Sequence, residues 1–167
     1  MTCVRFATTA EDTPMPVENL TKLLDEKGVP YLCLRHPATY TAQRTAQATH
    51  IKGKEMAKTV ILKVDGVMSM VVLPATAKVD LEHIREAIGA QKVELASESE
   101  FQSRFPHCEV GAMPPFGNLY GMGVFVDAHL AEDEVIAFNA GNHCEVIRLS
   151  YANFDELVKP NVGAYAA

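Results

Sequence analysis

Apolar residues recur at helical spacing in two parts of the chain. From Val17 to Leu24 they return every three or four positions, and Gly28 follows as a residue that can end a helix. The segment DLEHIREAIG, residues 80–89, repeats the pattern between an aspartate and a second glycine. Both segments are predicted to be amphipathic helices.

Other runs have the apolar and β-branched character of strands. TVILKV (59–64) and VMSMVVLP (67–74) flank Asp65-Gly66, a dipeptide typical of two-residue hairpin turns. Five shorter runs also predict strands: VPYLCLR, KVELA, GVFVD, EVIAFNAG and CEVIRLS. Strands outnumber helices and their connections vary in length. We therefore expect an α+β fold, a single domain with one mixed, mostly antiparallel sheet surrounded by helices.

Polar residues mark the starts of further helices. Thr41 is expected to cap a helix, and SESEFQSRF (97–105) opens with a serine and acidic residues, as a helix N-terminus does. ANFDELVKP predicts a last helix with Asn153 as its cap and a proline as its stop. Residues 1–16 show no period and are expected to form a flexible leader.

Composition changes this picture little. With 167 residues, 48% of them hydrophobic and 22% charged, the chain suits one soluble domain. No apolar run approaches the ~20 residues of a membrane span, and the first residues lack the pattern of a signal peptide. The four cysteines form no CxxC pair, which favours reduced thiols and a cytoplasmic protein. A net charge of −6 argues against non-specific coating of nucleic acid.

One lysine interrupts an apolar strand pattern. In EMAKTVILKVDG (55–66), Lys58 stands where a helix-like segment gives way to a strand, and it alternates with Val60, Leu62 and Val64. An ammonium that enters an apolar face costs several kcal/mol unless it finds a partner or stays solvated. The Lys58 side chain therefore either extends into solvent from the end of the helix or points into a pocket that needs a cation.

Basic residues also cluster around this lysine. Residues 41–63 carry a net charge of +4, although the whole chain is acidic. The cations are Arg44, Lys52, Lys54, Lys58 and Lys63. Such asymmetry suits one edge that meets a phosphate, and a solvated helix face explains it equally well.

Two glycine-containing loops carry further candidate chemistry. GAMPPFG (111–117) combines prolines, which fix backbone angles, with glycines, which permit unusual ones. A rigid loop of this kind can aim its N–H groups at one point, as an oxyanion site does, or it can be a tight structural turn. Gly141-Asn142 predicts another turn, with His143 beside it, where a histidine more often serves a turn or core than catalysis.

The sequence HCEV occurs twice, and the repeat raises the possibility of a metal site. A zinc set would consist of His107, Cys108, His143 and Cys144. Adjacent strand residues point to opposite faces, so each pair supplies at most one ligand, and chance repetition is the better explanation. The same divergence argues against a Cys144–His143 nucleophilic pair. No P-loop or GxGxxG follows a strand, so no cofactor is predicted.

Taken in order, these motifs resemble the YbaK family. The matching elements are His36-Pro37 with Thr41, AKTVILK, GAMPPFG, FVD, NAGNH, IRLS and VKP. This family consists of aminoacyl-tRNA deacylases related to the editing domain inserted in bacterial prolyl-tRNA synthetases. The resemblance runs from Val17 to Pro160, which predicts a deacylase domain over 17–160 and a C-terminal tail over 161–167.

The resemblance implies roles for individual residues. Lys58 takes the place of the family's essential lysine, and Gly111, Ala112 and Met113 form the catalytic loop. The substrate-binding residues implied are Tyr31, Thr41, Pro114, Gly141, Asn142 and His143. GAMPPFG differs from the more glycine-rich loop of the cysteine-specific members.

The implied activity is hydrolysis, in trans, of the ester bond of a mischarged aminoacyl-tRNA. The expected substrate is tRNA(Pro) that carries alanine, cysteine, serine or threonine, with an aminoacyl-tRNA synthetase as a further partner and neither membrane nor metal involved. Backbone N–H groups would stabilise the oxyanion and Lys58 would hold the anionic 3′ end, while water attacks with help from substrate groups. The alternative is a non-catalytic module that binds an aminoacyl end or a protein partner.

Overall fold

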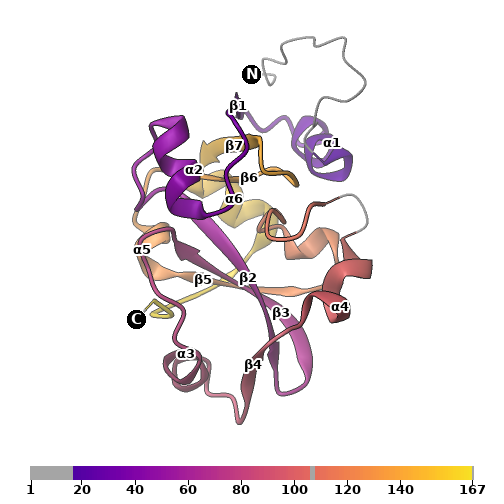
Figure 1. Ribbon diagram of the computed structural model, residues 1–167, viewed down its shortest axis with the longest axis vertical. Helices are drawn as coiled ribbons and strands as arrows, with labels where there is room; N and C mark the ends of the chain where they lie inside the picture. The colour runs from indigo at the N-terminus through magenta and orange to yellow at the C-terminus, as the bar shows by residue number, and fades with distance from the viewer. Residues whose placement is uncertain (1–16, 106–107, 167) are drawn as a thin grey trace.

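The computed structural model describes residues 17–105 and 108–166, so the expected leader lies outside the described residues. The helices are α1 (Glu18–Glu26), α2 (Ala42–Thr49), α3 (Leu81–Ile88), α4 (Glu98–Phe101), α5 (Ala128–Ala131) and α6 (Tyr151–Val158). The strands are β1 (Leu32–Arg35), β2 (Ala57–Val64), β3 (Val67–Pro74), β4 (Val93–Leu95), β5 (Gly123–Asp127), β6 (Val135–Asn139), β7 (Glu145–Ser150) and β8 (Asn161–Gly163) (Figure 1).

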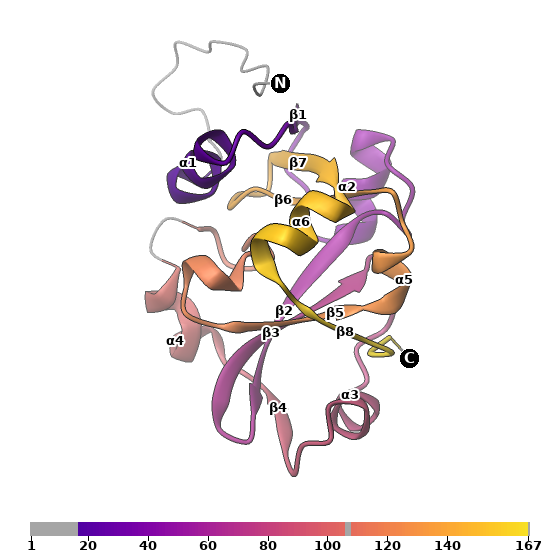
Figure 2. The same cartoon turned by 180° about the vertical axis from the view of Figure 1, so that it is seen from behind.

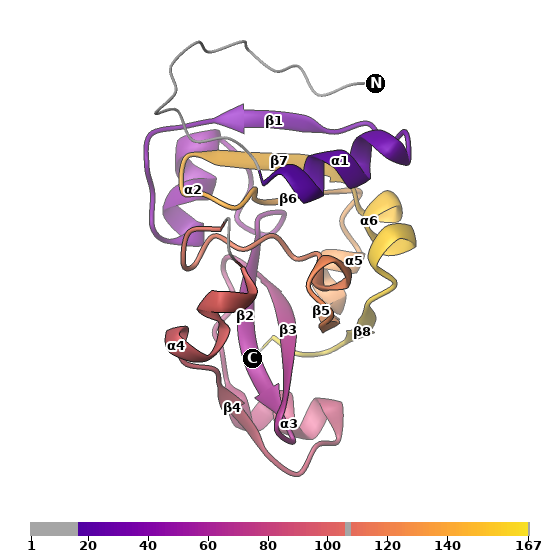
Figure 3. The same ribbon diagram turned by 90° about the vertical axis from the view of Figure 1, so that its right-hand side faces the viewer.

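The strands form two sheets that run in different directions (Figure 3). One has the order β1-β7-β6 and is antiparallel throughout. The other has the order β4-β2-β3-β5-β8, in which β5 pairs in parallel with both β3 and β8. The α+β class and the antiparallel majority are confirmed, but the expected single sheet is divided. The division arises because, among the described residues, the pairing of β6 toward β2 is limited to an isolated Met56–Ala137 bridge and a hydrogen bond from the Ala137 N–H to the Glu55 carbonyl.

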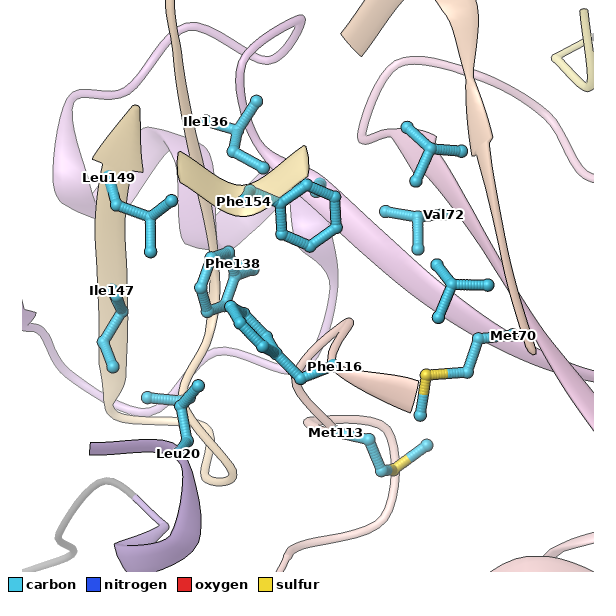
Figure 4. Packing of buried hydrophobic residues seen from close by; sticks show 14 of the residues in the cluster. Leu20, Met70, Val72, Met113, Phe116, Ile136, Phe138, Ile147, Leu149 and Phe154 are labelled. Carbon is cyan, nitrogen blue, oxygen red and sulfur yellow. The ribbon is translucent and has the colours of Figure 1, made fainter. Parts of the chain in front are cut away.

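The main hydrophobic core lies between the two sheets and is closed by α1 and α6 (Figures 2 and 4). Strand alternation places Ile136 and Phe138 of β6 on this side, and β3 contributes Met70 and Val72. Three buried aromatic rings meet at its centre: the centroid of Phe116 lies 5.4 Å from that of Phe138 and 5.5 Å from that of Phe154. Because Phe116 follows the GAMPP segment, this packing fixes one end of the predicted loop.

The opposite face of the larger sheet is covered by α3 and by the C-terminal residues. Tyr165 is buried there against Leu73 and Ile84. Asp127 Oδ1 accepts hydrogen bonds from the N–H groups of Tyr165 and Ala166, at 3.0 and 2.9 Å. The described part of the expected tail, 161–166, thus packs onto the domain: Asn161–Gly163 form β8, and the buried carboxylate at the end of β5 holds the residues that follow.

Several predicted local features are present. The hairpin pairs Val64 with Val67 around Asp65-Gly66, and the Thr41 side chain caps α2 by accepting from the Arg44 N–H at 3.2 Å. The predicted start of the last helix was wrong: α6 begins at Tyr151, because Ser150 Oγ accepts from the Asn153 N–H and is the true cap.

The segment before Lys58 is a turn and not a helix. The strand already begins at Ala57, because the Ala75 N–H donates to the Met56 carbonyl at 2.7 Å and extends the hairpin ladder backwards. Lys58 therefore belongs to the strand itself.

Gly117 offers a test of the packing behind the loop. A Cβ at this position would lie 2.5 Å from the Met122 carbonyl oxygen and 2.6 Å from Val124 Cγ2. We expect Gly117→Ala to lower the free energy of unfolding by about 1–3 kcal/mol in urea titrations, because the backbone must shift to admit the methyl group. Gly123→Ala is the matched control, since nothing lies within 4 Å of its Cβ position. Equal stability of the two variants would contradict the prediction.

Candidate active site

The predicted loop and the predicted turn are hydrogen-bonded to each other. The Glu109 N–H donates to the Gly141 carbonyl at 2.8 Å, and the Gly141 N–H donates to the Ala112 carbonyl at 3.0 Å. Gly111 and Gly141 have φ values of +85° and +99°, which other residues adopt only with strain. These two segments, about thirty residues apart in sequence, form one rigid unit that brings together most of the predicted site residues.

His143 packs inside this unit with only 8% of its surface exposed. Its Nε2 lies 2.9 Å from the Val110 carbonyl oxygen, so this nitrogen carries the proton and donates. Its backbone N–H donates to Glu109 Oε1 at 3.4 Å, and a Cβ on Gly111 would lie 3.6 Å from its Cε1. Because Nε2 is occupied as a donor, this geometry suits a residue that positions the loop.

A third segment, residues 36–41, joins the unit along the other side of the turn. The His36 N–H donates to the Cys144 carbonyl at 2.8 Å, and the Thr39 N–H donates to the His143 carbonyl at 3.1 Å. The ring centroid of Tyr40 then lies 4.8 Å from that of His143. Tyr40 was not among the predicted site residues, although it is an aromatic residue in a polar loop close in sequence to the motif residue His36, which is a signal that could have identified it.

The backbone donors of the loop are not equivalent. The Ala112 N–H donates to the Glu109 carbonyl at 3.1 Å and is thus used within the loop. Within residues 17–105 and 108–166, the N–H groups of Gly111 and Met113 donate to no other residue. The Met113 side chain and Pro114 are buried, and Figure 4 shows Met113 directed toward the main core beside Phe116. The loop is therefore anchored by its side chains while two backbone donors remain available.

Lys58 lies near the start of β2, opposite Leu73 of β3, and shares a face with Val60 and Leu62. Its Nζ donates to the Ala77 carbonyl oxygen, and burial lowers the pKa of the ammonium below its ordinary value. The half-buried cation thus has a neutral partner and no carboxylate among the described residues. No hydrogen bond or ion pair in the described part of the chain joins it to the 111–114 loop.

Exposed lysines surround Lys58. Gly53 packs so closely on Thr76 that a Cβ would lie 2.8 Å from the threonine methyl carbon, so residues 52–58 and 75–78 run side by side. Lys52, Lys54 and Lys78 are exposed on these two segments. Lys63 does not belong with them, because it lies toward the far end of β2 and pairs with Glu94 at 3.4 Å and Glu100 at 2.7 Å.

Two of the predicted substrate-binding residues, Tyr31 and Thr41, use their hydroxyls in hydrogen bonds outside the loop-and-turn unit. Tyr31 is buried in the main core, and its hydroxyl donates to Asp25 Oδ1 of α1 at 3.2 Å. Thr41 uses its hydroxyl to cap α2. Asn142 remains in the unit, where its Oδ1 accepts from the Cys144 N–H at 2.8 Å and shapes the turn.

The described residues give no indication of a metal centre or of a thiolate nucleophile at Cys108. The described residues include no group of three or more His, Cys, Asp or Glu side chains that could hold a metal, and His107 lies outside them. Burial raises the pKa of Cys108, which keeps this thiol protonated 3.5 Å from the Tyr120 hydroxyl. In the described residues, no helix is long and apolar enough to cross a membrane.

Comparison with known sequences decides the family. The profile of the aminoacyl-tRNA editing domain matches residues 36–157. The chain belongs to this family. The editing domain is therefore an aminoacyl-tRNA deacylase, a hydrolase whose substrate is the ester between an amino acid and its tRNA. The resemblance to YbaK proteins seen in the sequence is confirmed.

Individual relatives agree with this assignment. The editing domain is 26% identical over 161 residues to the prolyl-tRNA editing protein ProX of Acetoanaerobium sticklandii, and the match covers 86% of this chain and 91% of ProX. The crystal structure of hypothetical protein APE2540 shares its fold, with a TM-score of 0.79, 20% identity and coverage of 90% and 100% of the two chains. A candidate trans-editing enzyme for prolyl-tRNA synthetase has a TM-score of 0.77, 17% identity and coverage of 89% and 94%.

Proposed function

We propose that this deacylase acts in trans on tRNA(Pro) that carries a small non-cognate amino acid: alanine, cysteine, serine or threonine. The observation that carries the proposal is the rigid unit of the 109–114 loop and the 140–144 turn, which leaves the N–H groups of Gly111 and Met113 available. The choice of tRNA(Pro) is supported by the similarity to a prolyl-tRNA editing protein over most of both chains.

In the proposed reaction, the ester carbonyl oxygen accepts hydrogen bonds from Gly111 and Met113 as it becomes an oxyanion. Water adds to the carbonyl carbon, the bond to the ribose oxygen breaks, and the proton from water passes to that oxygen. The products are the free amino acid and a free terminal hydroxyl. His143 holds the loop through its bond to the Val110 carbonyl and takes no proton at Nε2. Burial raises the pKa of Cys108, which does not favour this thiol as the nucleophile.

Lys58 is proposed to bind the anionic 3′ end. One N–H of its ammonium is held by the Ala77 carbonyl, which leaves two donors in a fixed orientation for a phosphate oxygen. In this proposal the oxyanion donors bind the ester carbonyl and Lys58 binds the RNA of the same aminoacyl-tRNA. A shared substrate therefore needs no hydrogen bond between Lys58 and the loop.

Hydrolysis rates of a set of differently charged tRNAs test the proposal directly. Hydrolysis of Ala-, Cys-, Ser- and Thr-tRNA(Pro) is expected to exceed that of Pro-tRNA(Pro), because a pocket discriminates by ~1–3 kcal/mol for each methylene. Ala-tRNA(Ala) is the control for tRNA choice, with and without prolyl-tRNA synthetase to reveal selection by a partner. Equal hydrolysis of every ester would contradict the substrate assignment, and protection of the esters would indicate a binding module instead.

The lysines around Lys58 predict a salt dependence. We expect the triple variant Lys52→Ala/Lys54→Ala/Lys78→Ala to bind tRNA more weakly and to show a shallower slope of log K against log salt. Each lost phosphate contact reduces that slope by about 0.7 for a single strand or 0.9 for a duplex. Lys92→Ala is the control, since this exposed lysine lies beside β4 and pairs with Glu94. An unchanged slope in the triple variant would remove this surface from the RNA interface.

A further inference from the structure

Tyr40 is a solvent-exposed aromatic side chain next to the site. It leaves 74% of its surface in solvent, more than any other large apolar side chain that the structure describes. The hydrophobic effect does not hold an exposed ring in place, so its position must be explained by its neighbours. Those neighbours belong to the loop-and-turn unit.

The backbone on both sides of Tyr40 is fixed. On one side, the Thr39 N–H donates to the His143 carbonyl at 3.1 Å, and the hydroxyls of Thr39 and Thr45 lie 2.7 Å apart. On the other side, Thr41 caps α2 and its carbonyl accepts from the Thr45 N–H at 2.9 Å. Little backbone freedom is therefore left for a ligand to remove when it binds to the ring.

The ring lies at the rim of the proposed oxyanion site. It packs against the His143 ring at an interplanar angle of 49°. A Cβ on Gly111 would lie 3.6 Å from that ring, and the Gly111 N–H has no hydrogen-bond partner among the described residues. The adjacent first turn of α2 has no acidic residue and exposes Arg44. An open aromatic face beside a cation fits a ligand that combines flat rings with phosphates, as single-stranded RNA does.

We propose that Tyr40 is the platform on which a base of the single-stranded tRNA 3′ end stacks. This inference rests on the proposed function, because an ester held at Gly111 and Met113 places the last nucleotides beside this ring. Any base can stack on an aromatic face. Such stacking would orient the terminal ribose without selecting for the sequence of the RNA. A protein partner that covered the ring would instead leave RNA binding independent of Tyr40.

The experiment compares Tyr40→Ala and Tyr40→Phe on an alanyl minihelix of the tRNA(Pro) acceptor stem. Tyr40→Ala is expected to raise KM on the order of 5- to 150-fold with a smaller effect on kcat, while Tyr40→Phe stays near wild type. Leu95→Ala, which alters an exposed apolar residue on β4, is the matched control and should leave KM unchanged. Thermal unfolding of all variants checks that the fold is intact.

Minihelices with an abasic site at the last, second-last or third-last nucleotide then identify the stacked base. The Tyr40→Ala penalty should disappear on one of them and persist on the others. A penalty that is equal on all of them, or equal for Tyr40→Phe, would overturn the proposal. If the wild type hydrolyses no ester, the proposed function fails. Fluorescence anisotropy with the uncharged minihelices still decides the stacking, by the same comparison of variants and abasic sites.

Discussion

Lys58→Ala is expected to lower kcat/KM for Ala-tRNA(Pro) about 10- to 150-fold. A charge-assisted hydrogen bond to a phosphate contributes roughly 1.5–3 kcal/mol, and each 1.36 kcal/mol changes the rate tenfold. The Ala77 carbonyl already orients this ammonium, so the loss falls on a preorganised contact. Single-turnover hydrolysis of labelled Ala-tRNA(Pro) measures the effect.

Three further variants separate charge from packing. Lys58→Met keeps most of the side chain but no charge, and should be as defective as the alanine variant. Lys54→Ala removes an exposed cation from the same surface and should cost far less. Undiminished hydrolysis by Lys58→Ala would remove this residue from the mechanism. Because burial lowers the pKa of Lys58, wild-type activity should fall as pH rises toward the alkaline range, and Lys58→Arg should delay that fall.

Asp127→Ala is expected to lower the free energy of unfolding by about 3 kcal/mol. The carboxylate is fully buried, and it accepts hydrogen bonds from the N–H groups of Tyr165, Ala166 and His129. Its removal leaves buried donors without acceptors and releases the C-terminal segment that covers Tyr165. Urea titration followed by circular dichroism measures the change, and Glu132→Ala, an exposed carboxylate nearby, is the control. A wild-type midpoint for Asp127→Ala would show that β8 docks without this anchor.

The same aspartate predicts a pH dependence of stability. Burial by itself raises the pKa of Asp127, but hydrogen bonds from Ala166 and His129 outweigh burial and leave the pKa below its ordinary value. The contribution of the ionised Asp127 carboxylate to the free energy of unfolding is present above about pH 3.9 and is lost as pH falls through the lowered pKa.

The side-chain hydrogen bond to Asp127 raises the pKa of His129, 2.7 Å away. The contribution of protonated His129 to the free energy of unfolding is present below about pH 6.5 and is lost as pH rises through the raised pKa. Wild-type stability relative to Asp127→Ala should thus be greatest between about pH 4 and 6.5. Denaturation midpoints measured from below this range to above it give the difference in stability, and a difference that stays constant over the whole series would contradict the prediction.

Local structure could be predicted from the sequence because its causes lie within a few residues. The Asp65-Gly66 hairpin, the Thr41 cap and the α3 helix depend on turn chemistry, capping and apolar period, and all are present. The same local rules failed at Asn153, where the choice between two possible caps depended on how far β7 continued. The family motifs were likewise visible as short strings in a fixed order.

The tertiary structure decided which distant segments meet. Only folding joins Glu109 to Gly141 and gives Lys58 a partner nineteen residues away at Ala77, because the first bond links two distant loops and the second depends on how β2 pairs with β3. Folding likewise placed Tyr31 in the core and Tyr40 against the His143 ring.

The sequence by itself determined the α+β class, the family and the loop, turn and lysine that carry its motifs, since these are properties of local pattern and order. The tertiary structure alone decided that the loop and the turn form one rigid unit and that the last residues belong to the core. It also showed that the lysine which interrupts an apolar strand is held by a backbone carbonyl. Each of these outcomes depends on contacts between segments far apart in the chain, and no local pattern encodes them.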